Sequence, residues 1–404
     1  MIVHERVILN KSFLFVLLLF SGAIFLPYKL YFGNGLPVQI INVVVIFSIL
    51  STRKVNTFSV VIPILFSCYL LFLSVLSSYQ DFSLSILIDY IRFGLLSYFL
   101  YLDSDDEKII NYGYKLSLIA FLAILFSLCF FGVGREQGEF NYMTFGNYMA
   151  LSSLFFTIYI FLGRNIIFNL TLLVVAFVLI LIFGNRGSLL VVFSMFIICL
   201  LFNDAFTFKK YLSLLFLMSI FVIFYFHIEE IALLIKSLMT DLGYYSYSII
   251  KITNVILGDE TISSSSSGRD VIYNMIYNDI LNGGIKLYGI DYVYTVSKGE
   301  FFYSHNIFLD ILLMFGIFGV GIIFLISIMF FTFITFCKNK YKKLLFLCFF
   351  SFSFTKLSFS STFLIEPTFW IFLSVGFSML KLKIDRKVFF NKTIAGKTHK
   401  HARI

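Results

Sequence analysis

Long apolar stretches, separated by short polar breaks, recur along the whole length of this 404-residue chain. Each stretch holds about 16 to 31 residues. A helix that rises about 1.5 Å per residue needs about 20 apolar residues to cross a hydrocarbon layer about 30 Å thick. The stretches lack the alternation of polar and apolar residues that is typical of a membrane β-barrel. The pattern predicts an all-α polytopic membrane protein.

The composition excludes an ordinary water-soluble fold. The chain is 60% hydrophobic and only 13% charged, whereas a soluble domain carries about 25% charged residues. The five cysteines lie in or beside apolar runs, so neither a disulfide framework nor a cysteine zinc site is indicated. The net charge of +9 is explained by membrane topology, and no nucleic acid partner is expected.

We predict about 12 transmembrane helices. The predicted spans are 12–31, 36–51, 57–78, 84–102, 113–133, 144–162, 166–184, 187–203, 211–229, 306–336, 344–361 and 366–382. Residues 166–203 must hold two spans, because one helix of that length would be about 57 Å long. We therefore expect a tight turn at Asn185-Arg186-Gly187.

The distribution of basic residues predicts the orientation. With the N-terminus inside, the inner segments hold 21 of the 31 lysines and arginines and the outer segments hold eight. Both termini are then cytoplasmic. The chain divides into helices 1–9 (residues 1–229), one large periplasmic loop (230–304), helices 10–12 (305–383) and a basic cytoplasmic tail (384–404).

The large outer loop is where polar chemistry has room. It carries eight acids, five bases and nine tyrosines. Ile231–Leu238 and Tyr247–Leu257 are apolar enough to lie as short helices on the membrane face, and Asp270–Leu281 is also predicted to be helical. The serine run from Ser263 to Ser267 is typical of a flexible connector.

His305 lies where this loop meets the tenth predicted span. A neutral imidazole there is suited to take a proton from a sugar hydroxyl, since its ordinary pKa of about 6.5 is close to neutral pH. Asn306 and Asp310 are close enough in sequence to orient the ring. The alternative interpretation is an interfacial residue that caps a helix.

Two arginines are candidates to bind a diphosphate. The turn between two apolar helices forces Arg186 to the outer surface, and Arg269 precedes the predicted loop helix. Two arginines that converge from different loops would match the charge of a diphosphate. The alternatives are snorkelling of Arg186 to lipid headgroups and a solvated loop charge at Arg269. Arg135, also on the outer side, is a weaker candidate.

Other polar residues have more ordinary interpretations. Asp89 and Arg92 are three residues apart and therefore lie on one face of the fourth span. They are interpreted either as a functional pair within the membrane or as a structural salt bridge. Lys356 and Glu366 allow the same two readings. Loop tyrosines such as Tyr303 are suited to stack on sugar rings or to form an interface belt. No motif for metal or nucleotide phosphate binding is present in the sequence.

Taken together, these features resemble the O-antigen polymerase and O-antigen ligase family of bacterial envelope glycosyltransferases. The resemblance rests on the dozen spans, the large outer loop, and four local motifs in the order in which they occur. These motifs are Arg186-Gly187, Gly268-Arg269, Gly289-Ile290-Asp291, and His305-Asn306 leading into Gly316 and Gly319. The family commonly has a tryptophan after the loop arginine, where this chain has Tyr273 and Tyr277; its single tryptophan is Trp370.

The resemblance implies a glycosyltransferase of the bacterial inner membrane that uses an undecaprenyl-diphosphate-linked oligosaccharide and needs no metal or other cofactor. Arg186 and Arg269 would hold the diphosphate, with Arg135, Asn306 and Tyr303 as further substrate contacts, and His305 would act as the base. Among family members, the richness in phenylalanine favours a polymerase of lipopolysaccharide repeat units. A ligase that transfers the glycan to lipid A core, and less readily a lipid-linked oligosaccharide flippase, are the alternatives. A chain-length regulator and a separate flippase are the implied protein partners.

Overall fold

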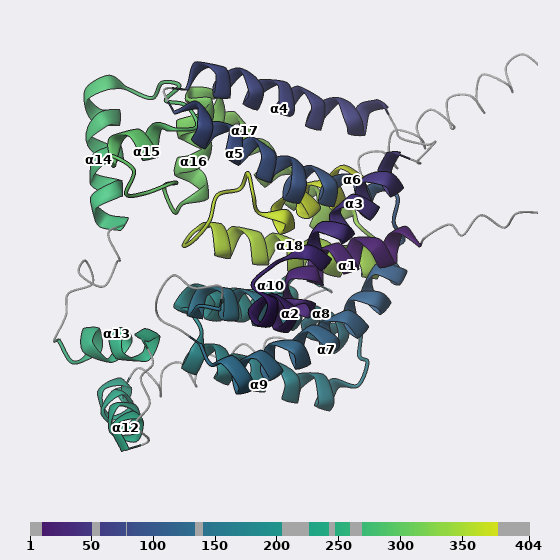
Figure 1. Cartoon of the computed structure of the whole chain (residues 1–404), viewed down its shortest axis with the longest axis vertical. Coiled ribbons are helices and arrows are strands. Elements are labelled where there is room, and N and C mark those ends of the chain that lie inside the picture. The colour runs from purple at the N-terminus through teal and green to yellow at the C-terminus, as the bar shows by residue number, and fades with distance from the viewer. Residues whose placement is uncertain are drawn as a thin grey trace, which may run out of the picture.

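The computed structural model describes residues 10–50, 57–77, 79–133, 140–203, 226–241, 247–258 and 269–378. Throughout these residues the chain forms helices joined by turns, with no strand (Figure 1). Five helices are long and apolar enough to cross a membrane, or six if the bent pair α1 and α2 is one span. The prediction of an all-α fold is confirmed for the described residues, and these long apolar helices support the prediction of a membrane protein. The count of about 12 spans and the periplasmic side of the large loop stay predictions.

The helices follow the apolar stretches of the sequence. In chain order they are α1 (Lys11–Ile24), α2 (Leu26–Phe32), α3 (Leu36–Leu50), α4 (Thr57–Leu76), α5 (Gln80–Asp89), the π-helical segment η1 (Tyr90–Leu95), α6 (Leu96–Leu102), α7 (Asp106–Phe131), α8 (Tyr142–Phe161), α9 (Ile166–Phe183), α10 (Arg186–Phe202), α12 (Ile228–Asp241), α13 (Tyr247–Ile256), α14 (Arg269–Gly283), α15 (Tyr292–Val296), α16 (Ile307–Phe315), α17 (Ile317–Phe336), α18 (Lys340–Leu357) and a last helix, Pro367–Ser378. Most of the ninth predicted span, 211–229, lies outside the described residues.

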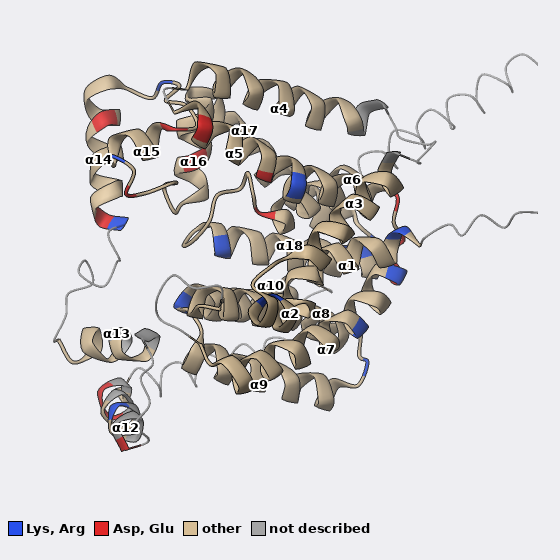
Figure 2. Ribbon diagram, in the orientation of Figure 1, with Lys and Arg blue, Asp and Glu red and all other residues tan. Residues whose placement is uncertain are grey.

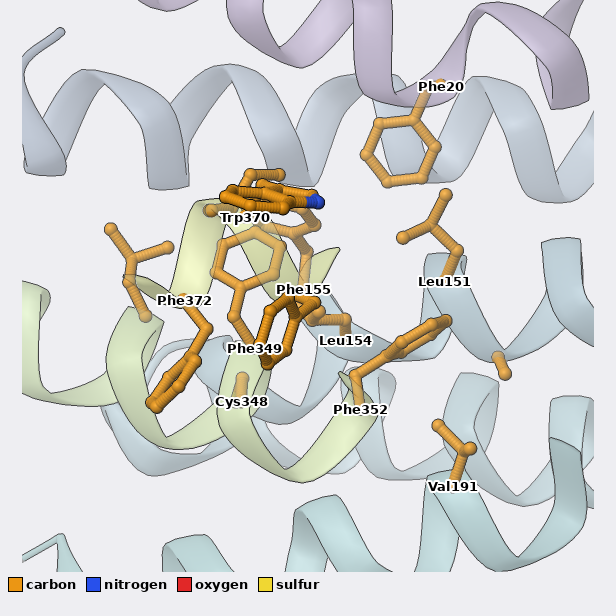
Figure 3. Close-up of a cluster of buried hydrophobic side chains, with 14 of the residues drawn as sticks. Phe20, Leu151, Leu154, Phe155, Val191, Cys348, Phe349, Phe352, Trp370 and Phe372 are labelled. Atoms are coloured by element: carbon orange, nitrogen blue, oxygen red, sulfur yellow. The ribbon is translucent and has the colours of Figure 1, made fainter. Parts of the chain in front are cut away.

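Aromatic side chains fill the centre of the bundle. Phe155 of α8 and Phe349 of α18 are fully buried, and Phe372 and Trp370 of the last helix lie in the same cluster (Figure 3). Trp370 donates its indole N–H to the carbonyl oxygen of Phe363 at 2.9 Å. Burial of an aromatic ring removes about 150–250 Å² from solvent or lipid contact, so this cluster holds α8, α18 and the last helix together.

Charged residues are sparse in the interior. Figure 2 shows most of them at the ends of helices and few along their middle. This distribution agrees with a bundle whose sides face hydrocarbon, because an unpaired charge there is costly.

The turn between α9 and α10 presents Arg186 as the first residue of α10. Asn185 caps α10, and its side-chain oxygen accepts from the Ser188 N–H at 2.6 Å. Gly146 of α8 packs beneath this turn, since a β-carbon there would lie 2.9 Å from the Ser188 oxygen and 3.1 Å from the Asn185 nitrogen. The predicted turn at Asn185-Arg186-Gly187 is confirmed, and close packing by Gly146 holds it.

The tenth predicted span is not one continuous helix, and this part of the sequence prediction is wrong. Gly316 adopts φ +57 and ψ −138, which ends α16 after nine residues, and α17 begins at the next residue. A β-carbon at Gly319 would lie 2.8 Å from the carbonyl oxygen of Ile311. The two glycines therefore provide a sharp break and a close contact between α16 and α17.

Short helices of the large loop pack on α16. Ile272 and Ile276 of α14, Val293 of α15 and Leu313 of α16 form a separate small hydrophobic cluster. The N–H of Tyr288 donates to the carbonyl oxygen of Leu313 at 3.0 Å. The helix predicted at Asp270–Leu281 is confirmed as α14, and its packing fixes Arg269 relative to the segment that carries His305.

Candidate functional site

Three residues that are far apart in the sequence converge at the start of α14. Arg186 begins α10, Arg269 begins α14, and His305 immediately precedes the cap of α16. The positive charge of Arg186 acts on Arg269, and the positive charge of Arg269 acts on His305. The structure therefore brings together the two arginines and the histidine that sequence reasoning had selected.

Arg269 lies half-buried among aromatic hydroxyls. Its pKa is lowered from the ordinary value, first by burial and then by the nearby Arg186, while the hydroxyls of Tyr273, Tyr303 and Tyr142 act in the opposite direction. Two guanidinium groups that act on each other repel, and an anion bound between them would relieve this repulsion. The arrangement is therefore compatible with binding a group that carries more than one negative charge.

His305 adopts an unusual backbone conformation, with φ +58. The left-handed region costs a residue with a β-carbon about 1–2 kcal/mol, and such strain is concentrated at functional sites. Its ring lies 4.4 Å from the ring of Tyr303, centroid to centroid. Burial, and then the charge of Arg269, lower its pKa to about 4, so the imidazole is neutral at physiological pH.

Asn306 and Asp310 do not orient the imidazole, contrary to the sequence interpretation. The Asn306 side-chain oxygen accepts from the N–H of Phe308 at 2.9 Å and caps α16. Asp310 accepts from the Ser304 hydroxyl at 2.6 Å. The buried Nδ1 of His305 has no hydrogen-bond partner among the described residues. The short side-chain amide of Asn306 reaches the backbone N–H two residues ahead, so it serves as the helix cap. The imidazole ring of His305 is therefore placed by packing.

The low pKa of His305 predicts a pH-dependent stability. Between pH 6.5 and about 4 the unfolded chain binds a proton on this residue and the folded chain does not, so the folded state loses stability as the pH falls through this range. We expect the melting temperature of the purified protein to drop more between pH 7.5 and 4.5 than that of His305→Asn, which cannot titrate. Parallel changes in the two proteins would contradict this assignment.

Tyr303 connects the histidine to the hairpin that precedes the last helix. Its hydroxyl faces the backbone of Ser361 and the side chain of Ser360, and burial is the main cause of its raised pKa. The Tyr273 hydroxyl lies 3.4 Å from the His305 carbonyl oxygen. Sequence reasoning named Tyr303 as a substrate contact and Tyr273 as a residue at the position of the family tryptophan, and the structure places both beside His305.

The sequence analysis did not identify every residue near the site, and one residue that it named lies outside the described part of the chain. The cluster of Arg186, Arg269 and His305 is bordered by three residues that the sequence analysis did not select: Tyr142, Ser360 and Ser361. No local pattern identifies them, because the residues they contact lie in distant segments of the chain. Arg135 lies outside the described residues. Trp370, the single tryptophan, belongs to the buried core and not to this cluster. On α14 the aromatic residue that acts on Arg269 is Tyr273.

The two ion pairs proposed from the sequence, Asp89 with Arg92 and Lys356 with Glu366, both form. Arg92 lies 3.7 Å from Asp89, and both side chains are about 40% exposed. Lys356 lies 2.6 Å from Glu366, with side chains 16% and 4% exposed. Within the described part of the chain, no three His, Cys, Asp or Glu side chains are grouped as they would be to hold a metal ion.

No protein-family profile, curated protein or solved structure matches this chain.

Proposed function

We propose that this protein is a glycosyltransferase that polymerises surface polysaccharide. It would join undecaprenyl-diphosphate-linked oligosaccharide repeat units, the O-antigen repeats of lipopolysaccharide, at the outer face of the bacterial inner membrane. The observation that carries the proposal is the convergence of Arg186 and Arg269 beside a neutral, partly buried His305. This group combines a binding site for a diphosphate leaving group with a proton acceptor.

The reaction follows from these charges. A hydroxyl of the acceptor sugar attacks the anomeric carbon of the donor, the bond from that carbon to the diphosphate oxygen breaks, and the configuration inverts. The two arginines stabilise the negative charge that grows on the leaving diphosphate. The hydroxyl proton passes to His305. A bound diphosphate offsets the charge of Arg269, one cause of the low pKa of His305, so the donor itself makes the imidazole more basic.

Apolar grooves next to the site support a lipid-linked substrate. One groove of about 280 Å³ begins at Phe308, three residues after His305, and runs between α16, α17 and α18. A second, of about 520 Å³, shares Ile311 and Ile326 with the first. Both are lined almost wholly by aliphatic and aromatic side chains, as expected for the binding of a polyprenyl chain whose diphosphate lies at the arginines.

The test is a gel profile of surface polysaccharide from cells that lack this protein. We expect the ladder of long chains to be lost and core that bears a single repeat unit to remain, and the wild-type gene to restore the ladder. Long chains that stay on the lipid carrier and never reach the core would instead establish a ligase. A normal ladder without the protein would exclude both activities.

A further inference from the structure

An open cavity of about 600 Å³, with polar and charged groups among a largely apolar lining, is bordered by α1, α3, η1, α8 and the hairpin before the last helix. This volume is in the range of pockets that bind small ligands, about 300–1,000 Å³. Among the described residues that line it, the charged ones are Lys29, Arg92, Lys356 and Glu366. Three cations against one acid give the lining an excess of positive charge.

Glu366, the acidic residue of the lining, already has partners for both of its carboxylate oxygens. Lys356 approaches one oxygen of Glu366 at 2.6 Å, and the Thr368 hydroxyl donates to the other at 2.7 Å. The pair is close to neutral as a unit. Arg92 forms an ion pair with Asp89 at 3.7 Å, but Asp89 does not line the cavity and the Arg92 side chain is about 40% exposed. A guanidinium group whose ion-pair contact is this long can still bind an anion in the cavity.

A buried amide at the cavity wall lacks hydrogen-bond partners. Asn42 of α3 is only 7% exposed, and neither its side-chain nitrogen nor its oxygen is hydrogen-bonded within the described structure. Leaving a buried donor and acceptor unsatisfied is costly. Gln39 and Asn147 add two more amides to the lining. Amides beside aromatic rings are the groups that bind the hydroxyls and ring faces of sugars.

The cavity lies next to the cluster of Arg186, Arg269 and His305. Ser361 lines the cavity, and its backbone faces the hydroxyl of Tyr303, whose ring lies against His305. On the other side, Asn147 lines the cavity and accepts from the Ser188 hydroxyl at 3.0 Å, two residues after Arg186. A sugar held in the cavity would therefore lie next to the proposed reaction centre.

The backbone around Arg92 is also unusual. Arg92 and Phe93 line the cavity from η1, a six-residue π-helical segment between α5 and α6. Such segments are rare and occur frequently at functional sites. Gly94 of the same segment packs against the indole of Trp370, to which a β-carbon would approach within 2.7 Å. The indole is therefore a natural reporter of events at this wall.

We propose that this cavity is a subsite for an acidic sugar of the glycan acceptor, a unit that carries a carboxylate. Arg92 binds the carboxylate, and Asn42 binds ring hydroxyls. This inference rests on the proposed glycosyltransferase function, because it gives that reaction an acceptor subsite. The same positive charge would also attract a phosphate, so the experiment separates the two sources of negative charge.

The test measures binding of trigalacturonic acid to the full-length protein in detergent micelles, by calorimetry and by the fluorescence of Trp370. We expect saturable binding with a fluorescence change. Asn42→Leu and Arg92→Gln should each weaken it about tenfold or more, as expected when a buried polar or charged contact is lost. Arg92→Lys should retain part of the affinity. Asn42→Leu should melt no lower than wild type, since it removes an unsatisfied amide.

The controls separate this proposal from the proposed function. Lys108→Gln, an exposed charge change on α7, and Arg186→Ala should both bind trigalacturonic acid normally, although Arg186→Ala loses transfer activity. Absent binding, equal binding of maltotriose, or unchanged binding in Asn42→Leu would each overturn the subsite even if the ladder assay supports a polymerase. Competition by inorganic diphosphate that depends on Arg92 would show a phosphate site instead.

Discussion

Replacing Arg269 with alanine is expected to lower kcat/KM for glycan transfer by about 10³-fold, the effect of removing one cation from a developing leaving-group charge. This corresponds to a barrier increase of about 4 kcal/mol. The measurement is transfer of a labelled lipid-diphosphate-linked oligosaccharide by the purified protein. Arg269→Lys should recover only part of the rate, because an ammonium group cannot form the two parallel hydrogen bonds of a guanidinium.

The stability of the same variant separates function from structure. The pKa of Arg269 is lowered by burial and by Arg186, so the fold holds this charge at a cost. Arg269 is also the first residue of α14, where a cation opposes the helix dipole. We therefore expect Arg269→Ala to melt at or above the wild-type temperature, with Lys236→Ala in the same loop as a control for activity. An inactive and less stable variant would point to a structural role.

Replacing His305 with asparagine is expected to lower kcat by about 10²–10⁴-fold, the usual contribution of a general base. Asparagine is the informative choice because it tolerates the left-handed backbone that His305 adopts, whereas alanine would add backbone strain to the loss of the imidazole. The measurement is kcat as a function of pH, in which the acidic limb due to the imidazole should disappear in the variant.

Two further observations decide the role of His305. Added imidazole in solution should restore part of the activity of His305→Asn, since it can enter the space that the smaller side chain leaves. A loss of less than tenfold together with an unchanged pH profile would show that His305 positions the acceptor and does not take its proton. In that case the arginine-held leaving group would be sufficient for transfer.

Local sequence patterns predicted the parts of this protein that depend on neighbouring residues. The turn before Arg186 was predictable because two apolar stretches of span length meet there, and a helix cannot be twice the membrane thickness. The helix α14 was predictable from its own pattern. The break at Gly316 was missed because the surrounding residues are uniformly apolar, and glycine in an apolar helix is common in membranes.

The sequence by itself determined the helical membrane class, the turn at Arg186 and the choice of Arg186, Arg269 and His305 as candidates. These follow from hydropathy, helix geometry and the rarity of charge in the chain. Only the tertiary structure decided that the three residues meet and that the cavity beside Asn42 exists. Both depend on contacts between segments more than 30 residues apart and on side-chain packing. No local pattern encodes such contacts, because the folded bundle alone determines which polar groups remain without partners.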